Sequence, residues 1–259
     1  MSRSNPTAKN PATRFMQWRG GEDGGGRITW YDKEAEEEKE VDLPFTFLVL
    51  DEFHTITGFS EKDHSGFWSN EVRDLKDELV VKTKSGTIAR GKYDDIKDKI
   101  KALGAKYTKS VYIAFKDETG EFVIGNIKIG GAALTAWIEF QGKFDVNQVA
   151  VMVTEKPKKA KKGSTTYFVP VFEARNVSDA TNNAAIALDK ELQQYIGTYL
   201  SRKPEEDDLE EVDDDVEIED TDEPVEIPPA QEAKPVKTKK AAPKEEPEED
   251  TIDLKDVPF

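Results

Sequence analysis

The distribution of charge along the chain limits the region that can fold around a hydrophobic core. Residues 204–259 contain 23 acidic and 6 basic residues, one phenylalanine and no tryptophan or tyrosine. Residues 1–203 contain 30 acidic and 31 basic residues, a net charge of +1, and hold all four tryptophans. A segment rich in like charge and proline cannot offset its ordering entropy by burying apolar surface. We therefore expect a folded body followed by a disordered acidic tail over 204–259.

Composition also narrows the class of protein. No run approaches 18 apolar residues, so we expect no membrane span. The first residues lack the apolar core of a secretory signal, and the absence of cysteine excludes disulfides and thiolate metal sites. These features favour a cytoplasmic location.

The body shows the short apolar alternation of a mainly β domain. Residues 1–26 are polar and glycine-rich, and we expect a flexible N-terminal arm whose Phe15, Met16 and Trp18 can dock as a short strand. Residues 32–40 predict a charged turn, and residues 59–70 predict a loop. We expect strands over 27–31, 43–58, 78–82, 87–90, 107–116, 121–129, 149–154 and 167–172.

The stretch 43–58 is the strongest predicted strand, because apolar residues lie on both of its faces. Strict alternation places Phe45, Phe47, Val49 and Phe53 on one face, and Leu48, Leu50 and Ile56 on the other. Such a strand is covered on both sides over its first half.

Three stretches have helical spacing. Tyr93, Ile96, Ile100 and Leu103 recur on one face before Gly104. Ala133, Trp137 and Phe140 share a face in a second helix, and Ser178 can cap a third. Strands, hairpins and accessory helices favour an OB-like antiparallel Greek-key barrel over 27–203, with a sandwich or an open sheet as alternatives.

Signals of catalysis are sparse. His54 and His64 stand in no metal-binding or deaminase motif. Asp51 with Glu52, or Glu61 with Asp63, can in principle share a metal, but neighbouring acids are common in a body with 30 of them. We therefore predict no enzyme, no cofactor and no metal, and keep a metal-dependent nuclease as the less favoured alternative.

Signals of nucleic-acid binding are better developed. Single strands are held by cations that follow the backbone and by aromatic faces on which bases stack. We predict that the nucleic-acid-binding residues include Arg19, Arg27, Trp30, Tyr31, Trp68, Lys82, Lys84, Arg90, Tyr107, Tyr112 and Tyr167. Arg14, Lys92 and Trp18 are further candidates.

A lysine-rich segment adds the densest positive charge of the body. Lys156, Lys158, Lys159, Lys161 and Lys162 fall within seven positions between the strands predicted over 149–154 and 167–172. We expect these two strands to pair and the lysines to form the tip of a long hairpin. Five lysines so close repel one another, which favours a position opposite phosphates over a merely solvated tip.

The C-terminal tip combines acids with a terminal aromatic residue. A free carboxylate and a phenyl ring on Phe259 can enter a small apolar pocket rimmed by Arg or Lys, and flanking acids speed the encounter. The tip predicts partner-binding residues Asp253, Leu254, Asp256, Val257, Pro258 and Phe259.

This tip resembles the C-terminal tip of bacterial single-stranded DNA-binding proteins. Several bacteriophage single-stranded DNA-binding proteins also end in an acidic tail with a terminal aromatic residue, and the long body resembles this phage class more closely. Lys255 departs from the usual all-acidic run. The resemblance implies that the tip docks on replication and repair enzymes and competes with DNA for the binding groove.

Together these features predict a sequence-tolerant single-stranded DNA-binding protein of phage DNA replication, recombination or repair, acting in the host bacterial cytoplasm. Its expected partners are single-stranded DNA and, through the tip, a polymerase, helicase, primase or nuclease. A protein-binding adaptor of a replication complex is the main alternative. Homo-oligomer formation remains open.

Overall fold

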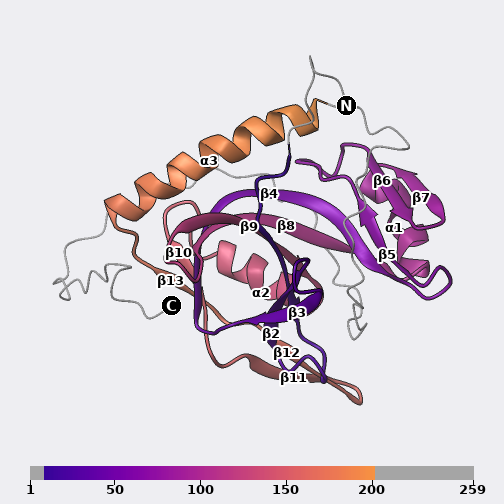
Figure 1. Ribbon diagram of the computed structural model, residues 1–259. Helices are drawn as coiled ribbons and strands as arrows, with labels where there is room; N and C mark the ends of the chain where they lie inside the picture. Colours follow the sequence, from indigo (N-terminus) through magenta and orange to yellow (C-terminus); the bar gives the residue numbers. More distant parts are fainter. Residues whose placement is uncertain (1–8, 202–259) are drawn as a thin grey trace, which may run out of the picture.

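A computed structural model describes residues 9–201 of the chain (Figure 1). The acidic tail and its tip lie outside the described residues. The strands are β1 (Arg14–Arg19), β2 (Arg27–Asp32), β3 (Glu37–Val41), β4 (Phe45–Ser60), β5 (Ser65–Ser69), β6 (Leu79–Thr83), β7 (Gly86–Gly91), β8 (Ala105–Lys116), β9 (Phe122–Gly130), β10 (Ala150–Val153), β11 (Lys158–Lys162), β12 (Thr165–Val169) and β13 (Phe172–Arg175). The helices are α1 (Tyr93–Ala102), α2 (Gly131–Gln141) and α3 (Asp179–Leu200). The body is mainly β, as the sequence predicted.

Most strands belong to one large sheet. Its order is β3-β2-β1-β9-β8-β4-β5-β6-β7, and β10 pairs with both β4 and β13. Strand β1 runs parallel to β9, so the sheet is mixed, whereas the sequence analysis expected antiparallel pairing throughout. The parallel pair arises because the N-terminal segment, which was expected to be able to dock as a short strand, lies between β2 and β9.

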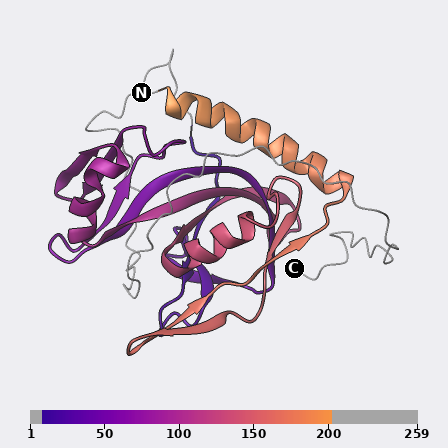
Figure 2. The ribbon, with the colours of Figure 1, turned by 180° about the vertical axis from the view of Figure 1, so that it is seen from behind.

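The sheet is strongly curved and has a helix on each side. Helix α2 lies inside the curl, and α3 crosses the outer face (Figures 1 and 2). Trp137 of α2 is fully buried against Phe47 of β4 and Phe172 of β13, which centres the inner core on this helix. Ser178 caps α3 by accepting a hydrogen bond from the Thr181 amide, as predicted. No described helix is long and apolar enough to cross a membrane.

A β-bulge in β4 changes which side chains face the inner core. The register between β4 and β8 shifts between Val49 and Asp51, and the extra residue reverses the alternation that follows. Phe53 therefore packs with Leu192 beneath α3, and Ile56 packs in the core of the α1 end. The sequence placed Phe53 with Phe45 on one face, which is wrong, because simple alternation cannot register a bulge.

Two segments expected as turns or loops contain strands. The charged stretch after β2 forms β3, and β5 lies within the predicted loop 59–70. Strand β3 is polar because it is an edge strand, where charged side chains oppose pairing with another chain.

Candidate nucleic-acid interface

The lysine-rich segment forms a hairpin of its own. Strand β11 pairs with β12 through a two-residue turn that begins at Gly163, whose φ is +58°. From the sequence, the lysines were expected at the tip of a hairpin between 149–154 and 167–172. That pairing is wrong, because β10 pairs with β13 and the lysine segment lies between them as a separate ribbon.

The lysines lie on both faces of this ribbon. Paired residues share a face, so Lys158, Ala160 and Lys162 lie beside Val169, Tyr167 and Thr165. Lys159 and Lys161 lie on the opposite face, where the Lys159 ammonium is 5.9 Å from the Phe168 ring centroid. All four lysines of β11 are exposed.

Tyr167 lies between two of these lysines. Its cross-strand partner is Ala160, and Lys158 and Lys162 are the residues two positions to either side of Ala160. Because alanine is small, the half-exposed Tyr167 ring is not overlaid by a large side chain from β11. The register places an aromatic residue between two lysines on one face of the ribbon.

The hairpin is attached to the loop that joins β1 and β2. The Phe168 amide donates a hydrogen bond to the Gly20 carbonyl at 2.7 Å, and the Trp18 indole donates to the Phe168 carbonyl at 2.9 Å. Gly26 has a φ of +81°, and a Cβ there would lie 2.7 Å from both Phe168 and Pro157. Only glycine allows this close approach. The structure thus brings the β1–β2 loop and the lysine hairpin together.

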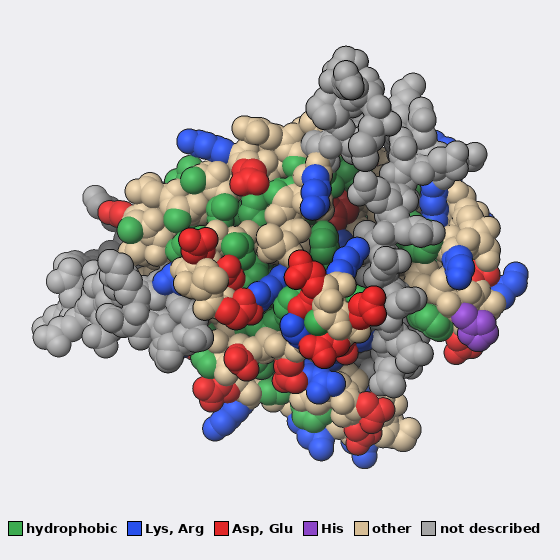
Figure 3. All heavy atoms as spheres, in the orientation of Figure 1, with side chains coloured by type: hydrophobic (Ala, Val, Ile, Leu, Met, Phe, Trp, Pro, Cys, Tyr) green, Lys and Arg blue, Asp and Glu red, His purple; other side chains and the backbone are tan. Residues whose placement is uncertain are grey.

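The predicted cations on β1 and β2 are engaged in ion pairs within the protein. Arg19 pairs with Glu38 at 2.8 Å, Arg27 with Glu40 at 3.5 Å, and Arg14 with Glu118. Acidic and basic side chains are accordingly interleaved over the β1–β3 face in Figure 3. In contrast, within residues 9–201 no ion pair involves Lys156, Lys158, Lys159 or Lys161.

The two predicted aromatic residues of β2 have different surroundings. The Trp30 side chain packs against the inner core, with the Arg14 guanidinium 4.5 Å and the Lys39 ammonium 5.8 Å from its ring centroid. A base therefore cannot stack freely on Trp30. Tyr31 is half-exposed and lies on the opposite, outer face of β2.

A further group of predicted residues lies at the far end of the sheet. Trp68 belongs to β5, Lys82 to β6 and Arg90 to β7, and Lys84 lies in the turn between β6 and β7. In Figure 1 these three strands lie away from β11 and β12. Lys82 is only 6% exposed, which argues against a phosphate contact at this position. Arg90 forms an ion pair with Glu78 at 2.9 Å. Lys84 is exposed in its turn.

The two predicted tyrosines of β8 both pack against neighbouring side chains. Tyr112 is 1% exposed, packs edge-on against Phe53, and lies beneath α3. Tyr107 packs against Tyr93 and His54, and its hydroxyl lies 2.5 Å from His54 Nδ1. Burial raises the pKa of both phenols. The sequence could not show that these tyrosines pack against other side chains, because buried and exposed tyrosines both occur in strands of alternating polarity.

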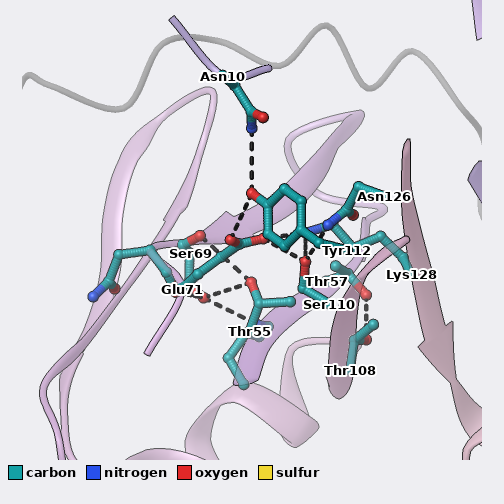
Figure 4. A network of polar contacts seen from close by, with 12 residues as sticks. Asn10, Thr55, Thr57, Ser69, Glu71, Thr108, Ser110, Tyr112, Asn126 and Lys128 are labelled. Carbon is teal, nitrogen blue, oxygen red and sulfur yellow. Dashed lines mark hydrogen bonds and ion pairs between the residues drawn. The ribbon is translucent and has the colours of Figure 1, made fainter. Parts of the chain in front are cut away.

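Tyr112 instead belongs to a polar network on the outer face of the sheet (Figure 4). Glu71 accepts hydrogen bonds from Ser110 at 2.5 Å, Lys128 at 2.7 Å and Tyr112 at 3.0 Å. Burial alone would raise the pKa of Glu71, but the Lys128 ammonium and these hydrogen bonds outweigh it and hold the pKa below its usual range. Asn10 donates to the Tyr112 hydroxyl and ties the N-terminal segment to this network.

The acidic residues considered for metal binding are occupied by other side chains. Asp51 forms a two-point contact with Arg73, and Glu52 accepts hydrogen bonds from Lys109, Trp137 and Gln141. Asp63 accepts hydrogen bonds from Ser60, Thr83 and Ser85, which lower its pKa. In the described part of the chain, no cluster of three or more acids and histidines could hold a metal ion.

The two histidines also lie apart. His54 is half-buried on β4, and burial together with the nearby Lys109 lowers its pKa. His64 is exposed in the turn between β4 and β5, with a φ of +47°. The predicted partner-binding residues Asp253, Leu254, Asp256, Val257, Pro258 and Phe259 lie outside the described residues.

Comparisons of the chain with protein-family models, with curated proteins and with solved structures give no match.

Proposed function

We propose that this protein binds single-stranded DNA with little sequence preference and acts in phage replication, recombination or repair. The observation that carries the proposal is the β11–β12 hairpin, whose four β11 lysines are exposed and where Lys158 and Lys162 share a face with the partly exposed Tyr167. Its attachment to the β1–β2 loop holds this constellation on the main sheet. We also propose that the curved sheet is an OB-like barrel that serves this binding.

Charge explains why the hairpin favours a polyanion. Lys158, Lys159 and Lys161 have exposed ammonium groups without an ion-pair partner among residues 9–201. Their mutual repulsion is relieved when phosphates lie between them, and the counterions released from the nucleic acid add to the affinity. The arginines of β1 and β2, which already have carboxylate partners, contribute less.

Stacking explains why the hairpin favours a single strand. The bases of a single strand are free to lie on an aromatic face, and each stacked base contributes about 1–3 kcal/mol. Tyr167 offers such a face between Lys158 and Lys162, which can hold the phosphates on either side of the stacked base. In a duplex the bases are paired and stacked on one another, so the ring has no partner.

The acidic tail completes the proposal. It carries 17 net negative charges on the same chain as the lysine hairpin, so it can compete with nucleic acid for these cations. Its last residues are proposed to bind basic pockets of replication or recombination proteins.

The test compares two variants that lose the same charge. One replaces Lys158, Lys159, Lys161 and Lys162 by alanine. The control replaces four exposed lysines elsewhere on the body, namely Lys76, Lys99, Lys143 and Lys190. Affinity for a fluorescent oligo-dT is measured from about 50 to 200 mM salt, a range over which phosphate contacts weaken markedly.

The hairpin variant should bind more weakly, and the slope of log affinity against log salt should fall by up to about 3, or about 0.7 for each lost phosphate contact. The control should retain most of the wild-type affinity and slope. Equal effects of the two variants, or no effect of the hairpin variant, would refute the assignment of the hairpin.

A further inference from the structure

The outer face of β1 and β2 carries two aromatic side chains that the inner core does not use. Met16 and Trp18 of β1, and Ile28 and Trp30 of β2, point into the inner core. Successive side chains of a strand alternate between faces, so Phe15 and Tyr31 lie on the outer face. Phe15 is 36% exposed, and Tyr31 is partly exposed.

These two aromatic residues are cross-strand neighbours. Met16 pairs with Trp30 in the antiparallel β1–β2 ladder, so the preceding Phe15 lies opposite the following Tyr31. On its other side Phe15 pairs with Asn126 of β9. Helix α3 packs on β4 and β9 of this face. The rings thus lie next to the part of the outer face that α3 covers.

Polar and charged groups continue this surface toward the lysine hairpin. Gln17, the next outer residue of β1, pairs with Lys128, whose side chain is 28% exposed. Arg19 and Arg27 form the following cross-strand pair, immediately before the loop that holds Phe168 of the hairpin. The exposed rings and the loop that holds the hairpin therefore lie along the same two strands, β1 and β2.

We propose that Phe15 and Tyr31 form a second base-stacking subsite, occupied by the same single strand that the lysine hairpin binds. This inference rests on the proposed function and extends it along β1. A strand held by the hairpin would pass Arg19 and Arg27 and place one or two bases on the rings. Tyr31 was predicted from the sequence as a binding residue, whereas Phe15 was not.

The surroundings of the rings favour a base over an apolar protein side chain. Two rings bordered by an amide, an ammonium group and ion-paired arginines form a small patch, whereas protein-binding patches are larger and continuously apolar. Because Glu38 and Glu40 neutralise the arginines, this subsite should contribute through stacking rather than through phosphate contacts. Stacking releases few counterions, so its loss should leave the salt dependence unchanged.

The experiment replaces Phe15 by leucine, which keeps an apolar side chain and removes the aromatic face. Phe144→Leu is the matched control, because Phe144 is 42% exposed in the turn that follows α2. Phe15→Leu should weaken oligo-dT binding by about 5- to 150-fold without changing the salt slope. Phe144→Leu should bind as the wild-type protein does.

Wild-type affinity of Phe15→Leu, alongside weakened binding by the hairpin variant, would overturn this subsite and leave the proposed function intact. Failure of the wild-type protein to bind any single strand would instead refute the proposed function. Photocrosslinking of a bromouracil-containing oligonucleotide to the wild-type protein gives a test that does not depend on the folding of a variant. Crosslinks should map to 14–19 or 27–32 as well as to the hairpin, and crosslinks confined to the hairpin would overturn the subsite.

Discussion

Replacing Glu71 by glutamine should destabilise the body at neutral pH. The carboxylate accepts hydrogen bonds from Ser110, Tyr112 and Lys128, while the Glu71 amide donates to the Tyr199 hydroxyl at 2.8 Å. Glutamine keeps the shape but leaves the Lys128 ammonium without a counter-charge. Breaking a buried ion pair by removing one partner costs about 3–5 kcal/mol.

The expected loss is smaller than that, because water can reach part of the pair. The Lys128 side chain is 28% exposed and that of Glu71 is 13% exposed, so we expect the free energy of unfolding to fall by about 2–3 kcal/mol. For a folded region of this size, that corresponds to a melting temperature lower by roughly 5–10 °C. Urea unfolding followed by tryptophan fluorescence measures the difference.

The pH dependence separates the charge of Glu71 from its shape. The folded-state pKa lies below the ordinary value of 4.5, so the stabilisation is fully present above that value and is lost as pH falls through the folded-state pKa. The difference between the wild-type protein and Glu71→Gln should therefore be largest near neutral pH and shrink in acid.

Glu78→Gln is the control, because Glu78 and Arg90 form an ion pair with side chains 48% and 45% exposed. It should change stability by less than about 0.5 kcal/mol. A Glu71→Gln effect as small as this, or one that does not vary with pH, would refute the reasoning.

Three further predictions concern the hairpin, the tail and a corrected residue. Gly26→Ala should displace the hairpin and weaken oligo-dT binding, because its Cβ would clash with Phe168 and Pro157; Gly25→Ala, with a similar φ of +65° and open space around it, should bind normally. Deleting residues 204–259 should tighten oligo-dT binding at low salt, and weaker binding would show that the tail is no competitor. Tyr112→Phe should lower unfolding stability by about 1 kcal/mol and leave oligo-dT affinity unchanged.

Much of the fold follows from local sequence patterns. The helix beginning at Tyr93 and the cap at Ser178 were predictable, because spacing and capping chemistry are encoded within a few residues. The face on which Phe53 lies was not predictable, because the bulge before it depends on how β4 pairs with β8. The parallel insertion of β1 beside β9 likewise depends on residues about 110 positions away.

In the candidate site, too, some features follow from the local sequence and others depend on tertiary packing. The cluster of lysines was visible as charge density, and the structure leaves the four on β11 exposed. Lys82 and Tyr112 could not be recognised as buried, because their burial depends on tertiary packing. A signal for Phe15 was present, since Met16 and Trp18 mark the inner face of β1 and leave Phe15 on the other.

The most direct test of single-strand binding is a titration of intrinsic tryptophan fluorescence in the full-length protein. The Trp18 indole donates to the Phe168 carbonyl of the hairpin, so its emission should respond when the hairpin is occupied. Oligo-dT should quench the fluorescence saturably, whereas a duplex of the same length should have little effect at the same salt concentration. No response to oligo-dT, or an equal response to the duplex, would contradict the proposal.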